Sequence, residues 1–243
     1  MCSWALRCLL IEDGNKLILI DNGMGDKQDE KFFGHYYLHG DDTLDKSLAQ
    51  HGFSKDDITD VFLTHLHFDH CGGSIVRDGD KLIPAFKNAT YWSNELHWDW
   101  AVNPNDREKA SFLKENILPI KENGQLKFVD VSEGTSVLDH TMRVKFAYGH
   151  TNAMMLPQIE YKGRTIIYMA DLLPSTGHIP IPYVMAYDMF PLKTLGEKKS
   201  FLTEGAEKDY VLYFEHDPTN ECCTLQLTEK GVRVKDTFKL EEL

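Results

Sequence analysis

The chain has 243 residues, of which 42% are hydrophobic and 26% are charged, so it is long enough to bury the core of a large globular unit. Its formal net charge of −12 argues against a surface built to bind nucleic acid or an anionic membrane, because phosphate binding needs concentrated basic side chains. The sequence holds no run of about 18 apolar residues, so no membrane span is predicted.

The first half of the chain is predicted to alternate strands and helices. Asp13-Gly14-Asn15 separates two apolar runs, 6–12 and 16–20, and such a turn sequence is typical of a hairpin. A helix is predicted over 43–51, ending at Gly52, followed by a buried strand over 58–63. We then expect a strand over 89–92, a helix over 93–101, and a helix from Asn105 to Leu118 that ends before Pro119.

The second half of the chain is richer in predicted strands. These cover residues 126–129, 135–138, 143–147, 154–160 and 164–169. A helix over 192–204, a strand over 210–215 and two closing strands complete the chain. Neither a repeat nor a flexible linker interrupts it. We therefore predict one α/β domain over residues 1–243, with two sheets covered by outer helices.

Metal-binding side chains follow the ends of four predicted strands. Strand ends at one edge of a sheet converge in space, so ligands that are far apart in sequence can meet there. The side chains are His65, His67, Asp69 and His70 after the first strand, and His150, Asp171 and His216 after the other three.

This set of side chains suits two divalent metal ions. Imidazole nitrogens combined with carboxylate oxygens favour zinc, and also fit iron, cobalt or manganese. Two ions roughly 3.5–4 Å apart would share a hydroxide nucleophile. The predicted division is one ion with His65, His67 and His150, a second ion with Asp69, His70 and His216, and Asp171 bridging the two.

The order and spacing of these residues resemble the metallo-β-lactamase superfamily. Thr64–Gly73 matches the H-x-H-x-D-H signature, and Gly149-His150-Thr151, Asp171 and His216 follow as the later motifs. Residues 17–26 resemble the early acidic strand-end motif, so the resemblance runs from about residue 6 to residue 234. It implies a four-layer αββα sandwich of two mixed sheets with a dinuclear site. Within the superfamily, the chain looks most like the branch of acyl-homoserine lactone lactonases and methyl-parathion-hydrolase-like enzymes.

The resemblance implies a metal-dependent hydrolase that uses a metal-bridging hydroxide on a lactone or ester bond of a small molecule. Asp69 is expected to orient the hydroxide or to carry its proton. Asp21 is expected to hydrogen-bond a ligand histidine or a nearby loop amide. Relatives often dimerise, so a homodimer is compatible with the resemblance. The irregular spacing of the five cysteines and the absence of a signal-peptide pattern in residues 1–11 indicate a cytoplasmic protein.

Three positions depart from the family pattern. Tyr148 stands where a proline often precedes the Gly-His-Thr motif, and Ala170 stands where a glycine often precedes the bridging aspartate. Pro174 stands where the lactone lactonases carry a tyrosine that helps to polarise the substrate carbonyl. Tyr183 or Tyr187, in the proline-containing segment 175–187, is the candidate replacement for that hydroxyl.

Other interpretations stay open at the level of sequence. The same ligands would serve a phosphotriesterase or a glyoxalase-II-like thioesterase, and a metal-stabilised binding protein without turnover would carry them too. Taken singly, each of these residues also has an ordinary structural explanation: the histidine-rich segment as a solvated polar loop, His150 as a capping or core histidine, Asp171 as a helix N-cap and His216 as a surface residue. The remaining histidines are expected at the surface or in the pocket, and these are His35, His39, His51, His97, His140 and His178.

Overall fold

The computed structural model describes residues 2–132 and 134–243. The chain forms two compact units, each assembled from separate segments. One unit, called the first unit below, comprises Cys8–Ser93 and Ala101–Phe128, and the second unit comprises Met1–Arg7, Asn94–Trp100 and Val129–Leu243. The single domain over 1–243 stays a prediction. Within the described residues, no helix combines the length and the apolar composition needed to cross a bilayer.

The first unit is built on a mixed sheet of five strands in the order β1-β2-β3-β6-β7. β1 and β2 form an antiparallel hairpin, as the turn sequence predicts, and the other neighbours in the sheet are parallel. Ile18, Val61 and Tyr91 on the central strands have no solvent exposure, so the sheet is covered by the core. The strands are β1 (Leu9–Asp13), β2 (Lys16–Ile20), β3 (Asp60–Phe62), β6 (Thr90–Ser93) and β7 (Leu126–Phe128).

Short helices and a separate hairpin complete the first unit. α2 begins where the Thr43 side chain accepts a hydrogen bond from the Lys46 amide, which confirms the predicted helix. The hairpin of β4 and β5 was not predicted, and α5 packs against it. These elements are α1 (Glu30–Gly34), α2 (Leu44–Gln50), α3 (Phe68–Cys71), α5 (Lys114–Glu122), β4 (Ile75–Asp78), β5 (Lys81–Pro84) and the 3₁₀ turns η1 (Lys55–Asp57) and η2 (Gly72–Ser74).

The helix predicted from Asn105 to Leu118 is wrong in its bounds. The Asn105 side chain does cap, because it accepts from the amides of Arg107 and Glu108, but only turns follow it. The helix itself, α5, begins at Lys114 and contains Pro119. Proline removes one helical hydrogen bond. Ile117, Pro119 and Ile120 are all buried, so side-chain packing offsets that loss.

The second unit is built on a mixed sheet of seven strands in the order β14-β13-β12-β11-β10-β9-β8. β11 and β12 are parallel, and the other neighbours are antiparallel. The strands are β8 (Thr135–Val137), β9 (Met142–Ala147), β10 (Met154–Tyr161), β11 (Arg164–Tyr168), β12 (Val211–Tyr213), β13 (Cys222–Thr228) and β14 (Gly231–Phe238).

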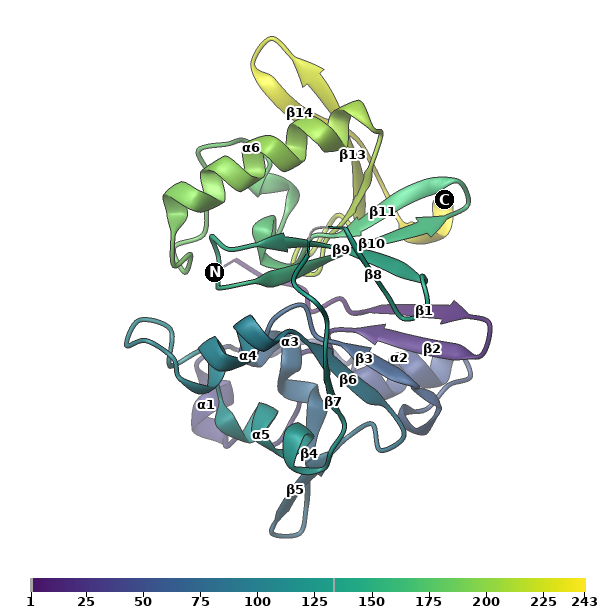
Figure 1. The fold of residues 1–243 in the computed structure, drawn as a ribbon, viewed down its shortest axis with the longest axis vertical. Coiled ribbons are helices and arrows are strands. Elements are labelled where there is room, and N and C mark those ends of the chain that lie inside the picture. The colour runs from purple at the N-terminus through teal and green to yellow at the C-terminus, as the bar shows by residue number, and fades with distance from the viewer. Residues whose placement is uncertain (1, 133) are drawn as a thin grey trace. The chain divides into compact units, whose positions relative to one another are not determined.

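Helices of the second unit follow the predicted positions closely. α6 (Pro191–Glu207) packs along β13 and β14 and buries Phe201 and Leu202 (Figure 1). α4 (Glu95–Val102) begins in this unit, and the 3₁₀ turns are η3 (Ala170–Leu172), η4 (Thr176–His178) and η5 (Leu240–Glu242). Two mixed sheets with associated helices confirm the α/β fold class predicted from the sequence.

Candidate metal centre

His65 and His67 form a close pair at the end of β3. His65 Nε2 lies 3.1 Å from His67 Nδ1. The outer nitrogen of each ring has its own acceptor: His65 Nδ1 lies 3.1 Å from Thr64 Oγ1, and His67 Nε2 lies 2.9 Å from the Glu108 carboxylate. Because these outer nitrogens donate, the two inner nitrogens face each other as lone pairs. Two such lone pairs at this distance suit a cation held between them, as in a chelate.

Asp69 and His70 form a second pair on the short helix α3, which begins directly after His67. His70 Nε2 lies 4.0 Å from Asp69 Oδ1. His70 Nδ1 lies 3.0 Å from Asp21 Oδ2, so its proton points away from Asp69. The helical turn brings the His70 ring back beside the His65 ring, with 3.9 Å between the ring centroids.

Asp21 supports the segment in the way that the sequence predicts. Its Oδ1 accepts from the Thr64 amide at 2.8 Å, and its Oδ2 accepts from the Thr64 hydroxyl at 2.7 Å as well as from His70. Asp21 has a φ of 54°, a left-handed conformation that costs energy for most side chains. The carboxylate thus fixes both the start of the histidine segment and the orientation of one of its rings.

Gly72 and Gly73 bring the end of α3 against the loop after β2. A Cβ on Gly72 would collide with the Met24 backbone, and one on Gly73 would collide with the Asn22 backbone. The Asn22 amide donates to the His70 carbonyl at 2.9 Å. Only glycine permits this approach, which explains why two glycines close the histidine-rich signature.

The second unit brings the other three predicted ligands together. His150 follows β9, Asp171 lies in η3 after β11, and His216 follows β12. His150 Nε2 lies 3.2 Å from Asp171 Oδ2, and His216 Nε2 lies 3.0 Å from Asp171 Oδ1. One carboxylate therefore presents a separate oxygen to each ring, which is the arrangement of a bridging ligand.

The far side of each of these rings is fixed by an acceptor. His150 Nδ1 lies 3.0 Å from Asp188 Oδ1, and His216 Nδ1 lies 2.8 Å from the Ala5 carbonyl. Since both partners can only accept, each neutral ring carries its proton on Nδ1, and its Nε2 lone pair then faces Asp171. As at His65 and His67, two atoms that can each bind a metal ion face one another, here a ring nitrogen and a carboxylate oxygen.

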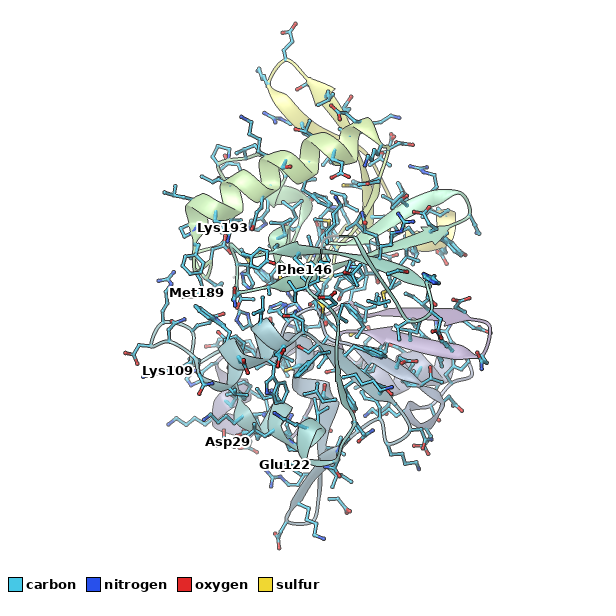
Figure 2. All side chains as sticks on the ribbon, in the orientation of Figure 1. Asp29, Lys109, Glu122, Phe146, Met189 and Lys193 are labelled. Carbon is cyan, nitrogen blue, oxygen red and sulfur yellow. The ribbon has the colours of Figure 1, made fainter. Side chains whose placement is uncertain are left out.

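The start of α6 holds the loop that carries His150. The Glu197 carboxylate accepts from the amides of Tyr148 and Gly149 at 2.8 and 3.0 Å, and the Met189 amide donates to the His150 carbonyl at 3.0 Å. Burial raises the pKa of Glu197, whereas the two amides act in the opposite direction. Met189 and Lys193 mark this end of α6 in Figure 2.

Lys198 holds the segment 175–187 that follows Asp171. Its ammonium donates to the carbonyls of Pro180, Ile181 and Tyr183, at 3.3, 3.2 and 2.5 Å. Burial lowers the pKa of Lys198 to about 8. The side chains of Tyr183 and Tyr187 are 61% and 72% exposed. The backbone of this segment is therefore anchored while its two tyrosine side chains extend into solvent.

Several positioning residues escaped the sequence analysis. Glu108 contacts His67, and Asp188 and Glu197 hold the loop of His150, yet no sequence pattern marks any of the three as the partner of a ligand. Their partners lie 38–49 positions away in the chain, so no local pattern signals them. The surface or pocket position expected for His97 is wrong, because His97 is fully buried and its Nδ1 contacts the Asn152 carbonyl at 2.6 Å.

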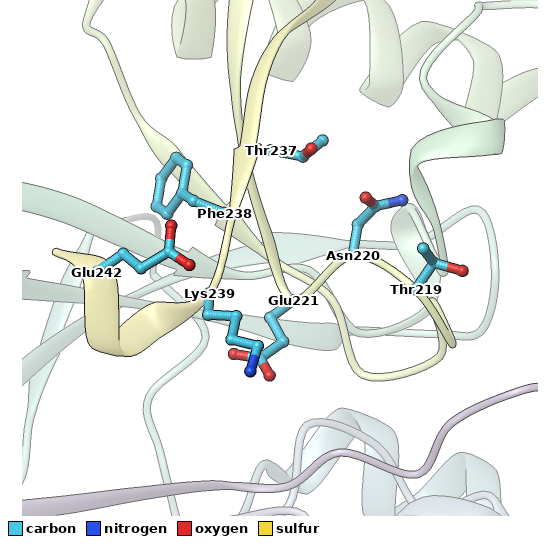
Figure 3. A pocket seen from close by; sticks show the side chains of 7 residues that line it. All are labelled: Thr219, Asn220, Glu221, Thr237, Phe238, Lys239 and Glu242. Atoms are coloured by element: carbon cyan, nitrogen blue, oxygen red, sulfur yellow. The ribbon is translucent and has the colours of Figure 1, made fainter.

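A separate pocket in the second unit contains none of the predicted ligands. Figure 3 shows that residues of the turn before β13 and the end of β14 surround it. Its lining mixes polar and charged side chains without a buried cluster of metal donors. The lining residues are Thr219, Asn220, Glu221, Thr237, Phe238, Lys239 and Glu242.

The donor set described above fits divalent metal ions. Each unit presents imidazole nitrogens with the proton held on the opposite side of the ring, and each also presents a carboxylate beside a ring nitrogen. Such acceptor-to-acceptor contacts are unfavourable unless a metal ion or a proton lies between the two atoms. Imidazole and carboxylate together are ligands that zinc, iron, cobalt and manganese share.

Curated relatives match part of the chain. The N-acyl homoserine lactonase of Bacillus thuringiensis is 27% identical over 122 residues, which cover 46% of this chain and 43% of the relative. The protein named AiiA from Bacillus thuringiensis subsp. kurstaki gives the same values. The match thus spans less than half of the length of these relatives.

Solved structures align with nearly the whole chain. A probable metal-dependent hydrolase from Staphylococcus aureus has a TM-score of 0.85 at 23% identity, covering 99% of this chain and 83% of that one. AidC, a dizinc quorum-quenching lactonase solved in complex with a product, has a TM-score of 0.79 at 25% identity, covering 97% and 81%. The fold of this chain is therefore the one that these hydrolases share.

The family assignment follows from the sequence profile. The profile of the Metallo-beta-lactamase superfamily matches residues 7–216, which is most of the 243-residue chain. That range begins just before β1 and ends at His216, so it takes in all seven predicted ligands. With the profile, the fold and the donor set in agreement, the chain belongs to the metallo-β-lactamase superfamily.

Proposed function

We propose that this protein is a dinuclear metal-dependent hydrolase that acts on a lactone or ester bond of a small molecule. The seven proposed ligands are His65, His67, Asp69, His70, His150, Asp171 and His216. Zinc is the favoured metal, and manganese, iron and cobalt suit the same donors.

The observation that carries the proposal is the position of Asp171 between two histidines. Its two oxygens lie 3.2 Å from His150 Nε2 and 3.0 Å from His216 Nε2, and both rings hold their proton on the far side. A carboxylate with a purely structural role would instead accept hydrogen bonds from N–H groups of its neighbours. One carboxylate offering a separate oxygen to each of two imidazole lone pairs fits a bridge between two ions.

Two bound ions would supply an activated water and stabilise the charge that develops on the substrate oxygen. The side chains of this chain have separate tasks. Asp69 is 24% exposed, so its carboxylate is accessible for proton transfer toward the leaving group. Glu108, Asp21 and Asp188 each accept a hydrogen bond from a proposed ligand ring and so orient its other nitrogen for metal binding.

The names of the relatives support the lactone or ester class. The Bacillus thuringiensis relatives are N-acyl homoserine lactonases, and AidC is a lactonase. Pro174 replaces the family tyrosine, so a hydroxyl for the substrate carbonyl has to come from elsewhere. The two exposed tyrosines of the segment 175–187, Tyr183 and Tyr187, are the candidates.

The proposal is tested with purified protein and four substrate classes: N-acyl lactones, aryl esters, aryl phosphotriesters and thioesters. We expect hydrolysis of lactones or esters that a chelator abolishes and that Zn²⁺, Mn²⁺ or Co²⁺ restores. Asp171→Asn should bind fewer than two metal ions and lose at least about 100-fold in kcat/KM, as loss of a ligand implies.

Asp209→Asn is the matched control, because Asp209 is 62% exposed, pairs with Arg164 and lies in the same unit. Its activity and metal content should equal those of the unchanged protein. The proposal fails if hydrolysis survives metal removal, or if Asp171→Asn keeps two ions and full turnover. Metal binding without hydrolysis of any class would favour the binding-protein interpretation instead.

A further inference from the structure

Residues 4–7 run alongside the chain that carries His216. The Ala5 amide donates to the His216 carbonyl and the Arg7 amide donates to the Glu215 carbonyl, both at 3.0 Å. The Arg7 guanidinium donates to the carbonyls of Phe214 and Asp217, at 2.7 and 3.0 Å. These contacts fix the backbone on both sides of His216, although residues 4–7 have no regular secondary structure.

Two further contacts from the same segment reach the His216 ring. The Ala5 carbonyl accepts the Nδ1 proton at 2.8 Å, which leaves the Nε2 lone pair toward Asp171. The Trp4 ring lies against the imidazole, with 4.9 Å between the ring centroids and 39° between the planes. The His216 side chain is 1% exposed, whereas Trp4 remains 41% exposed. The segment therefore sets the tautomer of the ring and covers one of its sides.

His150, the other histidine that contacts Asp171, is held by a different set of contacts. His150 receives its support from the Asp188 carboxylate and from the Met189 amide, both just before α6. The two histidines are therefore supported by different segments of the chain. A change in residues 4–7 is expected to act on His216 and to leave these supports of His150 unchanged.

We propose that residues 4–7 are a positioning segment for His216 that controls occupancy of one of the two metal positions. The inference rests on the proposed function, because it requires that His150 and His216 serve different ions. Loss of the segment's contacts allows the ring to rotate and Nδ1 to lose its partner, which weakens the metal position that includes His216. The position that includes His150 keeps its affinity.

Arg7→Met and Trp4→Ala test the proposal, each with a matched control in the same unit. Arg164→Met removes a guanidinium that also donates to a carbonyl, that of Asp209 at 3.3 Å, and Tyr161→Ala removes an aromatic ring of similar exposure, 44%. Metal-free protein is titrated with Co²⁺, and the visible absorption of the bound ion reports each binding step. Circular dichroism checks that each variant is folded.

The unchanged protein and both controls should bind two Co²⁺ ions. Arg7→Met and Trp4→Ala should keep one site at its original affinity and weaken the other at least tenfold, and Trp4→Phe should restore the weak site. Equal weakening of both sites, or unchanged affinity in both variants, would overturn the positioning role while leaving the proposed function intact. If the unchanged protein binds fewer than two ions, the dinuclear function itself is wrong. If Arg7→Met does not fold, Trp4→Ala alone decides.

Discussion

At the scale of single residues, each proposed ligand histidine is oriented by the hydrogen bond of the ring nitrogen that faces away from the proposed metal position. Asp21, Glu108 and Asp188 each accept a hydrogen bond from one ring, and the Ala5 carbonyl does so for His216. Each acceptor favours the tautomer that has the proton on its own side, so the other ring nitrogen is directed at the proposed metal position. The ring orientations are therefore fixed by the fold itself.

Glu204 gives a residue-scale prediction for the dependence of stability on pH. Burial raises the pKa of this carboxyl, but hydrogen bonds from Lys145, Lys208 and Tyr210 outweigh burial and lower the pKa from 4.5 to about 2. A depressed pKa stabilises the folded state above about pH 4.5, and this contribution disappears as the pH falls toward 2.

Glu204→Gln should therefore lower the melting temperature by a few degrees at pH 7, since the group is partly exposed and its ion pairs are screened. The difference from the unchanged protein should shrink as the pH falls from 4.5 to 2. Thermal unfolding of metal-free protein at several pH values measures this, and Glu207→Gln at the exposed end of α6 is the control. A difference that stays constant with pH would contradict the assignment.

At the scale of elements, α6 holds two loops and one strand of the second unit in place. Glu197 holds the loop before β10, Lys198 holds the segment after Asp171, and Glu204 ties the helix to β9 through Lys145. Two adjacent residues of one helix thus anchor two separate loops. Because a helix is stiff along its axis, a shift of α6 will move both loops together.

Gly149→Ala tests how tightly α6 packs on the His150 loop. A Cβ at this position would collide with the side-chain oxygen, the amide nitrogen and the Cα of Thr194. Since two of these atoms belong to the helix backbone, trimming Thr194 cannot relieve the collision. We expect a loss of about 1–3 kcal/mol in unfolding free energy and weaker metal binding.

Gly196→Ala is the control for that change. It lies on the same helix, and nothing stands within 4 Å of the added Cβ. It should be neutral or stabilising by about 0.4–1 kcal/mol. Chemical denaturation measures the unfolding free energy of both variants, and a Zn²⁺ competition assay measures their metal affinity. Equal values for the two variants would show that the close approach at Gly149 contributes nothing to stability or to metal binding.

At the scale of the whole molecule, the proposed ligands are divided between the two compact units, four on the first and three on the second. A ligand that binds only the folded protein raises its stability, by about 2.7 kcal/mol at 100 times Kd. Zn²⁺ should therefore raise the melting temperature, and a chelator should lower it. Calorimetry with and without chelator measures the shift, and Asp171→Asn should show a much smaller one. An identical melting temperature in both conditions would refute metal binding.

The positions of strands were predictable, because they depend on the pattern of neighbouring residues in the sequence. The strands leading to His65, His150, Asp171 and His216 were placed within a few residues, because apolar runs bounded by turn residues are local signals. Contacts that join distant segments were not predictable. Nothing near Glu108 indicates that it will reach His67, and α5, which contains the buried Pro119, packs against a hairpin of β4 and β5 that precedes it by some 30 residues.

The way Lys198 holds its loop has a consequence for changing what the protein acts on. Its ammonium donates to main-chain carbonyls of the segment 175–187, so these hydrogen bonds do not depend on which side chains the loop carries. A library for directed evolution can therefore vary Tyr183 and Tyr187, whose exposed side chains are the candidates for contact with the substrate, while the loop keeps these bonds. Gly72 and Gly73 allow no such freedom, because backbone already occupies the space beside them.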